Sequence, residues 1–497
     1  MNIPLWTSSE AETFTSGKNT AQWEAHSVSI DSRKVEKNGL FIAIQGPNND
    51  GHDYISMAQE KGAAAAVIAE SKIGDFKDCT LPLLIVTDTT QALYDLAAGA
   101  RFRTKAKVIA ITGSVGKTGT KEGLRCAFSA LGKTHATEGN LNNEYGLPLT
   151  MSRMPADTDF AILEIGMNHA EEIRPLSKLA KPDLAIITTV APVHLEFFHG
   201  IQGIADAKAE IFDGLGEDGI CLLPREHALF HHLRARARDT GVAFENVLSF
   251  GKHEDATYRQ IDTEFKTTST DVTCLYKKHC ESFSIQMPGD HWATNSLCIL
   301  GAVDILGEDV TKALNGLKNW KPSKGRGQRH IIPLEDNGTA ILVDESYNAS
   351  PPAMKAAFKV LADMPIKHGK RIAILGDMLE LGETGSSLHI ALAKELESRH
   401  IDAVYCCGPL MGEMYKALPT SMQRLHAKDS STLFDAVLSD LEDGDILLIK
   451  GSLGSKMVPV ADAFIALSDA ASQDKTPIKT PTGAMNLKPK EVHSHVV

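Results

Sequence analysis

The chain has 497 residues, which is enough for about three domains of ordinary size. Its formal net charge is −12 and no block of Lys and Arg stands out, so a nucleic-acid-binding surface is not expected. The 8 cysteines show no CxxC pair and no zinc-site spacing. No stretch approaches the ~18 apolar residues of a membrane span. These features predict a globular protein of the cytoplasm with reduced thiols and no membrane span.

Residues 1–105 are expected to form a first domain. Apolar patterning predicts strands over 40–44, 64–68 and 83–86 and a helix over 54–61. The Asp31-Ser32-Arg33 segment and the polar loop 48–52 are rich in turn-forming residues. By themselves, both favour a structural role.

The most informative stretch covers residues 107–131. An apolar β-branched run at 108–111 ends in the loop TGSVGKT at 112–118, and apolar residues at helical spacing follow. A strand, loop and helix in this order direct backbone N–H groups and a helix N-terminus at one point, which favours a phosphate. Lys117 would neutralise the outer phosphates and the Thr118 hydroxyl would hold Mg²⁺. The remaining loop positions are Gly113, Ser114, Val115, Gly116 and Gly119.

This loop is a short GxxGKT form, because Ile111 stands where the longer phosphate-loop pattern has its first glycine. A glycine-rich turn with a solvated lysine is the alternative interpretation. The strand and the helix that a phosphate loop requires are both predicted, and they favour the phosphate site.

Residues 106–330 are expected to form the nucleotide-binding domain. Apolar runs separated by helix-length segments predict a parallel sheet wrapped by helices, at 160–165, 184–189 and 220–223. Ligands bind such sheets at the carboxyl ends of the strands, where Glu164 and His194 stand. Each residue alone is more often a hydrogen-bonded core residue. Beside a phosphate loop, both become candidate metal ligands.

Lys208 lies in the segment GIADAKAEIF, on the same predicted helix face as Ile204, Ala207 and Ile211. An unpaired buried ammonium is unfavourable, so an inward lysine indicates an amine at a metal or phosphate site. The alternative is a lysine whose stem reaches water.

The remainder of the chain predicts two further structural regions. Apolar and polar residues alternate with period two over 248–287, which predicts an antiparallel insertion. A helix that carries Asn295 is predicted to follow it. Residues 331–470 predict a second, Rossmann-like doubly wound sheet, with polar signatures after its strands. Residues 471–497 are polar and lack periodicity, which predicts a flexible tail.

The assembled motifs resemble those of the Mur ligases. The resemblance rests on the loop at 112–118, on LEIGMN with Glu164, on HLE with His194 and on AKAEIF with Lys208. It also rests on PGDHWATN with Asn295, the Gly325-Arg326 pair, DESYNASP at 344–351 and the Asn-rich loop at 137–148. The run GDMLELGE at 376–383 is typical of the members that add D-alanyl-D-alanine.

The resemblance implies a three-domain α/β fold and an ATP-dependent peptide ligase of peptidoglycan precursor synthesis. In the implied reaction, the terminal carboxylate of UDP-N-acetylmuramoyl-tripeptide attacks the γ-phosphate of ATP. The amine of D-alanyl-D-alanine then displaces phosphate from the acyl phosphate. The resemblance further implies two Mg²⁺ ions held by Thr118, Glu164, His194 and a carbamylated Lys208.

The resemblance also implies roles for individual residues. Lys117, Lys208 and His194 would be catalytic. Further contacts to ATP would come from Asn295, Arg326, Asp344, Tyr347 and Asn348. The UDP-linked substrate would meet Ser32, Arg33, Asn48, Asp50, His52, Asn142 and Asn143. The dipeptide would meet Asp377, Lys450 and Ser452 in the third domain.

Three positions depart from the family pattern, namely Ala170, Glu345 and Ser350. They leave nucleotide binding intact and affect the residues around the site. One alternative is a related Mur-type ligase that adds a single amino acid or glutamate. The other is a non-catalytic protein that binds ATP as a regulatory ligand. We expect the ligase to be a monomer.

Overall fold

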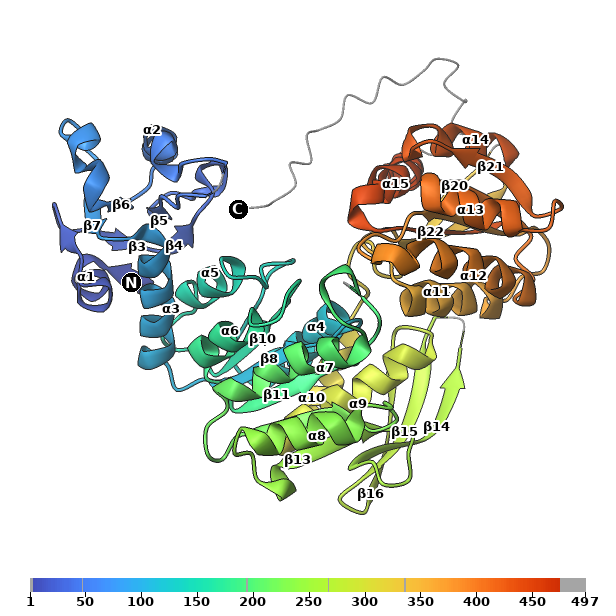
Figure 1. Ribbon diagram of the computed structural model, residues 1–497, viewed down its shortest axis with the longest axis horizontal. Helices are drawn as coiled ribbons and strands as arrows, with labels where there is room; N and C mark the ends of the chain where they lie inside the picture. Colours follow the sequence, from blue (N-terminus) through green and yellow to red (C-terminus); the bar gives the residue numbers. More distant parts are fainter. Residues whose placement is uncertain (1–2, 47, 194, 267, 335–336, 474–497) are drawn as a thin grey trace.

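The computed structural model describes residues 3–46, 48–193, 195–266, 268–334 and 337–473, and side chains through residue 470. The chain forms three units, each with a parallel or mainly parallel sheet of its own. Figure 1 shows the N-terminal and C-terminal units at opposite ends of the central unit. The expected α/β fold class is confirmed.

The N-terminal unit contains a sheet with strand order β2-β7-β6-β5-β4, in which only β2 is antiparallel. A separate ribbon pairs β1 with β3. The strands are β1 (Trp6–Thr7), β2 (Lys18–Asn19), β3 (Glu24–Ala25), β4 (Ser27–Ser29), β5 (Gly39–Ile42), β6 (Ala65–Ala69) and β7 (Leu83–Val86). The helices are α1 (Ser8–Thr15), α2 (Ile55–Glu60) and α3 (Thr89–Arg103).

The central sheet has the order β16-β15-β14-β13-β12-β11-β8-β10-β9. Its strands from β9 to β14 are parallel, and β14, β15 and β16 form an antiparallel extension of the same sheet. The strands are β8 (Lys107–Thr112), β9 (Thr134–Ala136), β10 (Phe160–Glu164), β11 (Leu184–Ile187), β12 (Ile220–Pro224), β13 (Val247–Gly251), β14 (Tyr258–Phe265), β15 (Thr270–Tyr276) and β16 (His279–Ile285).

Helices cover both faces of this sheet, so its central strands are apolar on both sides. On β8, Val108 and Ala110 belong to one core cluster, whereas Ile109 and Ile111 belong to another. The first cluster includes α5–α8 and continues into the N-terminal unit, and the second includes α4, α9 and α10. Their bounds are α4 (Lys117–Ser129), α5 (Gly146–Ser152), α6 (Ile173–Ala180), α7 (Ile201–Ala209), α8 (Phe230–Asp239), α9 (Asp290–Ile305) and α10 (Val310–Gly316).

The C-terminal sheet has the order β17-β18-β22-β19-β20-β21, with only β17 antiparallel. It begins at Gln328, just before the boundary expected at residue 331. Its strands are β17 (Gln328–Pro333), β18 (Thr339–Glu345), β19 (Arg371–Gly376), β20 (Ala403–Cys407), β21 (Gln423–Ala427) and β22 (Ile446–Lys450). Its helices are α11 (Pro351–Asp363), α12 (Gly385–Ser398), α13 (Pro409–Ala417), α14 (Leu433–Asp440) and α15 (Met457–Gln473).

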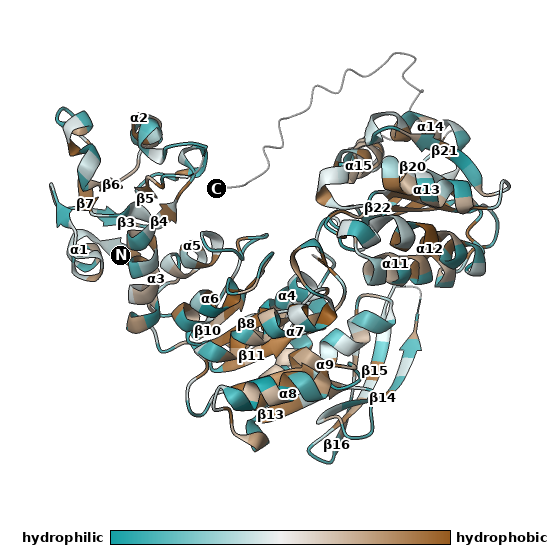
Figure 2. Ribbon diagram, in the orientation of Figure 1, coloured by the Kyte–Doolittle hydropathy of each residue, from teal (hydrophilic) through white to brown (hydrophobic). Residues whose placement is uncertain are grey.

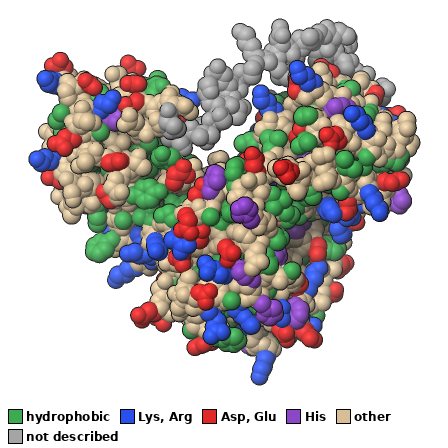
Figure 3. Space-filling model, viewed as in Figure 1, with side chains coloured by type: hydrophobic (Ala, Val, Ile, Leu, Met, Phe, Trp, Pro, Cys, Tyr) green, Lys and Arg blue, Asp and Glu red, His purple; other side chains and the backbone are tan. Residues whose placement is uncertain are grey.

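The hydropathy of the residues follows this layered arrangement. Figure 2 shows apolar residues concentrated along the inner strands of the sheets. Acidic and basic side chains occur on all three units of the face seen in Figure 3. Within the described residues, no helix combines the length and the apolar character needed to cross a bilayer.

Candidate active site

The loop between β8 and α4 has the backbone conformation of a tight phosphate-binding turn. Gly116 has φ +89° and directly precedes α4, so a side chain there would strain the turn. The Ser114 amide donates to the Thr189 carbonyl at 2.9 Å, and the Thr188 hydroxyl donates to the Val115 carbonyl at 2.6 Å. The loop is therefore anchored on the segment that follows β11, and the N-terminus of α4 faces the carboxyl edge of the sheet.

Glu164, at the end of β10, lies next to this loop and is 1 % exposed. Its Oε1 accepts from the Thr118 hydroxyl at 3.3 Å and from the Asn142 amide at 2.8 Å. Its Oε2 is buried and has no hydrogen-bond partner. The structure thus brings together Thr118, Glu164 and Asn142, three residues that the sequence places in separate motifs.

These oxygens fit a magnesium ion. Mg²⁺ prefers hard oxygen ligands and is usually held by one or two protein groups plus substrate phosphates. The Thr118 hydroxyl and the Glu164 carboxylate supply such ligands, and Oε2, which accepts no hydrogen bond from the described residues, has free acceptor capacity. No group of three or more His, Cys, Asp or Glu residues among the described residues forms a separate metal cluster.

Two lysines of the predicted site, Lys117 and Lys208, both have lowered pKa values. The Lys117 amine donates to the Gly113 carbonyl at 2.6 Å. Desolvation lowers the pKa of Lys117; Glu164 opposes this effect and Arg326 adds to it. Lys208, on α7, is 2 % exposed, and burial together with the Lys117 charge lowers its pKa well below the usual range. Lys208 therefore faces inward, as its helix face predicts.

The structure also reveals a buried lysine that the sequence analysis did not select. Lys121, on α4, is 0 % exposed. Its Nζ lies 3.1 Å from Glu122 and 3.8 Å from Glu164 Oε2, and donates to the Gly139 carbonyl at 3.4 Å. Lys121 precedes Leu124 by three positions and Phe128 by seven, so the helical spacing that singled out Lys208 was also available here.

Asn295 and the segment after α10 border the loop from the other side. A side chain at Gly116 would lie 3.4 Å from the Asn295 side-chain amide, so Asn295 lies close to the phosphate loop. The Arg326 guanidinium stacks over the Tyr347 ring at 4.3 Å from its centroid. The Asp344 carboxylate is fully buried and accepts from the Gly325 amide at 2.8 Å. Asp344 therefore holds the Gly325-Arg326 turn against β18.

Lys450, at the end of β22, is 3 % exposed on its side chain. Its Nζ donates to Glu345 and to the Asn348 carbonyl, each at 3.0 Å. Glu345, a departure from the family pattern, thus supplies the counter-ion of a buried lysine. The C-terminal unit therefore contributes Tyr347 and the Lys450 pair, and Arg326, from the segment before that unit, stacks on Tyr347.

Asp377 and Ser452, predicted to meet the dipeptide, make structural contacts. Asp377 is 5 % exposed and accepts from the Met411 amide at 2.7 Å, at the start of α13. The Ser452 hydroxyl accepts from the Leu379 amide at 3.0 Å. These contacts satisfy loop and helix amides that would otherwise lack partners. Their proposed substrate contacts stay predictions.

The N-terminal candidates lie on the first unit, apart from the phosphate loop. His52 is 4 % exposed, with Nδ1 2.5 Å from Asp50, and accepts from the Ala69 amide at 3.0 Å. The Ser32 hydroxyl contacts the Met57 sulfur at 3.3 Å, and Arg33 pairs with Asp31 at 2.9 Å. These contacts are local, and the predicted roles in substrate binding stay predictions.

Three other predicted site residues are Asn48, Asn143 and His194. Asn48 is exposed. The Asn143 side chain accepts from the Gly146 amide at 2.9 Å, at the start of α5. His194 lies outside the described residues, so its role as a metal ligand stays a prediction.

Fold and site together define a three-unit α/β protein with a phosphate-binding loop in its central sheet. Sequence profiles of the Mur ligase family match this chain in three segments. They are the Mur ligase family catalytic domain over 24–101, the Mur ligase middle domain over 111–303 and the glutamate ligase domain over 328–453.

Curated relatives match most of the chain. It is 34 % identical over 439 residues to UDP-N-acetylmuramoyl-tripeptide--D-alanyl-D-alanine ligase of Rickettsia prowazekii, covering 88 % of this chain and 94 % of that protein. It is 32 % identical over 451 residues to the Escherichia coli (strain K12) ligase of the same name, covering 88 % and 93 %. The chain belongs to the Mur ligase family, and the predicted resemblance is confirmed.

Solved structures of MurF ligases have the same fold as this chain. A crystal structure of MurF from Acinetobacter baumannii superposes with a TM-score of 0.81 at 26 % identity, covering 93 % of this chain and 100 % of that one. MurF ligase from Thermotoga maritima in complex with ADP gives a TM-score of 0.74 at 26 % identity, covering 90 % and 98 %.

Proposed function

We propose that this ligase joins D-alanyl-D-alanine to UDP-N-acetylmuramoyl-tripeptide with the conversion of ATP to ADP and phosphate. The observation that carries the proposal is the meeting of Lys117, Thr118 and Glu164 at one sheet edge, with the inward Lys208 nearby. The substrate identities are those in the names of relatives that match 88 % of the chain.

The proposed reaction proceeds in two steps. The substrate carboxylate attacks the γ-phosphorus and the bond to the β-phosphate oxygen breaks, which yields ADP and an acyl phosphate. The dipeptide amine then attacks the acyl carbon, phosphate leaves with its bonding electrons and the amine loses a proton. Two anions must meet in the first step, so cationic groups are needed around the phosphates.

Several residues of this chain supply that positive charge and hold the nucleotide. The Lys117 amine and the amides at the start of α4 would bind the outer phosphates, and Arg326 with Tyr347 would border the nucleotide. Thr118 and Glu164 would hold Mg²⁺, with His194 and Lys208 proposed for a second ion. Bound Mg²⁺ supplies charge neutralisation on the phosphates and orients them.

Lys208 is proposed to carry a carbamate. Burial and the neighbouring Lys117 lower the pKa of Lys208, which favours the neutral amine. A neutral amine adds to CO₂ and releases one proton, so the inward cation becomes an anionic oxygen ligand. This chemistry gives a purpose to a buried lysine that has no ion-pair partner among the described residues.

The remaining assignments follow from location. The N-terminal unit, with Ser32, Arg33 and the 48–52 loop, is proposed to bind the UDP-linked substrate. The C-terminal unit, around Lys450, is proposed to receive the dipeptide. We also propose a monomeric, cytoplasmic enzyme. The 8 cysteines are free, which fits a reducing compartment.

Phosphate release from the purified protein tests the proposal. ATP turnover is expected only when a UDP-linked tripeptide and D-alanyl-D-alanine are both present. Turnover with glutamate or another single amino acid would instead indicate a related Mur-type ligase. ATP binding without turnover in any combination would indicate a regulatory nucleotide-binding protein. Parallel assays with lysine-containing and diaminopimelate-containing tripeptides identify the preferred third residue.

A further inference from the structure

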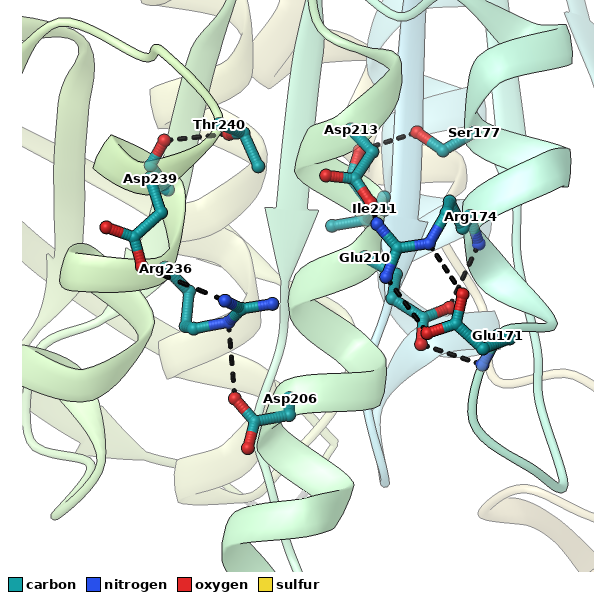
Figure 4. A network of polar contacts seen from close by, with 11 residues as sticks. Glu171, Arg174, Ser177, Asp206, Glu210, Ile211, Asp213, Arg236, Asp239 and Thr240 are labelled. Carbon is teal, nitrogen blue, oxygen red and sulfur yellow. Dashed lines mark hydrogen bonds and ion pairs between the residues drawn. The ribbon is translucent and has the colours of Figure 1, made fainter.

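A network of polar contacts lies beside Lys208 and has no role in the proposed chemistry. Figure 4 shows Glu210 next to Glu171 and Arg174. Glu210 is 3 % exposed, and its two carboxylate oxygens accept from two backbone amides. Oε1 accepts from the Glu171 amide at 2.8 Å and Oε2 from the Arg174 amide at 3.1 Å. A buried carboxylate with two amide donors is a strong local anchor.

The anchored segment is the loop that follows Glu164 and leads into α6. Within this loop, Glu171 has φ +68°, in the left-handed region that residues with a side chain rarely adopt. Such a conformation persists only where the surrounding contacts enforce it. The bonds from Glu210 are therefore well placed to hold the loop after the strand that carries Glu164.

Further contacts join the same two segments. The Arg174 guanidinium donates to Glu171 at 2.7 and 3.1 Å and also pairs with Asp213. The Ser177 hydroxyl donates to the Ile211 carbonyl at 2.5 Å. The start of α6 is thus attached to the turn over Glu210–Gly214 that ends α7 (Figure 4).

Lys208 stands two residues before Glu210, at the end of α7. We propose that Glu210 is a positioning residue, which locks the end of α7 to the loop after Glu164 and so keeps the Lys208 amine inside the site. Its benefit to the reaction rests on the proposed function of Lys208. Its effect on the location of the amine does not, because that effect follows from the contacts alone.

The same helix offers a matched control on its other side. Asp206 pairs with His232 at 2.9 Å. It also pairs with Arg236 at 3.2 Å, and Arg236 lies 3.7 Å from Asp239 (Figure 4). This second network ties α7 to α8 and does not involve the loop after Glu164. The Asp206 side chain is 44 % exposed, so its removal tests the loss of a different anchor of the same helix, nearer to solvent.

The test is reductive methylation of the ligand-free, full-length protein with ¹³C-formaldehyde and cyanoborohydride as the reductant, followed by mass spectrometry of the Lys208 peptide. The exposed Lys178 on α6 serves as the internal reference for reagent activity. Glu210→Ala is expected to raise the modification rate of Lys208 roughly tenfold, because local opening exposes the amine. Asp206→Ala is expected to leave that rate within about twofold of the wild type.

The Glu210→Gln variant provides a second test in case Glu210→Ala does not fold. Its amide keeps one acceptor oxygen, but its NH₂ group faces the other backbone N–H, so an intermediate rate is expected. The proposal is supported if Lys208 is modified faster in a folded Glu210 variant than in the wild type, while its rate in Asp206→Ala stays within about twofold of the wild type. Equal rates in the wild type and the folded Glu210 variant overturn it, and so does an equal increase in Asp206→Ala.

Steady-state kinetics separate positioning from the proposed reaction. Glu210→Gln is expected to lower kcat roughly tenfold while KM for ATP stays within about twofold, because the phosphate loop is untouched. An inactive wild-type protein would refute the proposed function and leave the methylation result valid. An active wild type with unchanged kcat in Glu210→Gln would refute the contribution of Glu210 to the reaction.

Discussion

Helices α4 and α7 each present one lysine to the protein interior, yet the surroundings of the two amines differ. Lys121, on α4, has Glu122 and Glu164 within ion-pair distance. Lys208, on α7, is instead buried near the positive charge of Lys117, and both burial and that charge lower the pKa of Lys208. The first lysine is a partnered cation, whereas the second is held in surroundings that favour the neutral amine.

This difference shows what an inward lysine means in this fold. A buried charge with counter-ions contributes to structure, and removing one partner leaves the other uncompensated. A buried amine with a depressed pKa is a nucleophile at ordinary pH. The apolar helix face identifies both residues, but only their neighbours separate a structural lysine from a candidate for modification.

Removing Lys208 is expected to have the largest effect. Lys208→Ala should lower kcat on the order of 10³-fold, because a group proposed to act on the transferring phosphate is lost. ADP binding, measured by calorimetry, should stay within about threefold, since Lys117, Thr118 and Glu164 remain. Lys208→Arg, which places a permanent cation there and cannot form a carbamate, should be as inactive. Full turnover in Lys208→Ala would refute the proposed role of the neutral amine.

Removing Lys121 should instead affect stability. Lys121→Met leaves Glu122 and the buried Glu164 without their common cation, which should lower the free energy of unfolding by about 3 kcal/mol. Urea denaturation measures this change. The control is Lys107→Met, whose partner Glu308 lies 2.6 Å away but whose side chain is 44 % exposed, and it should lose under about 1 kcal/mol. Similar losses in both variants would remove the distinction between buried and exposed pairs.

A smaller effect on stability is expected at Asp50, whose carboxylate is paired with His52 and Lys72 in the N-terminal unit. Despite some desolvation, the His52 amide and side chain and Lys72 lower the pKa of Asp50 from 3.8 to about 2. The folded state thus binds the proton more weakly than the unfolded state does. The charged carboxylate stabilises the fold above pH 3.8, and this contribution is lost as the pH falls towards 2.

The Asp50→Asn variant tests this linkage. It should lose about 1 kcal/mol at pH 7, and the difference from the wild type should shrink between pH 3.8 and about 2. Thermal unfolding across this range measures both quantities. A constant difference at all pH values would show that packing, and not the ion pair, accounts for the loss.

Much of the architecture was predictable from local patterns. The runs at 108–111, 160–165, 184–189 and 220–223 became β8, β10, β11 and β12, because strands buried on both faces are apolar throughout. The antiparallel region was also predicted, although the sequence did not reveal that it continues the central sheet. Helix α3 was missed, since its many small residues give a weak amphipathic signal.

The site was predictable to a smaller degree. Motif spacing identified Lys117, Thr118 and Glu164, which the structure brings together. It did not show that Asp377 accepts the amides at the start of α13, because those amides come from a distant part of the chain. It also passed over Lys121 and gave no role to Glu210, whose partners likewise follow from packing between elements.

The sequence by itself therefore determined the main strands of the central sheet, the phosphate loop and the inward orientation of Lys208. These features depend on side-chain periodicity and backbone freedom over a few neighbouring residues. Only the tertiary structure decided which buried charge meets which partner. That pairing depends on distances between residues far apart in the chain, and it separates the partnered Lys121 from the unusual amine of Lys208.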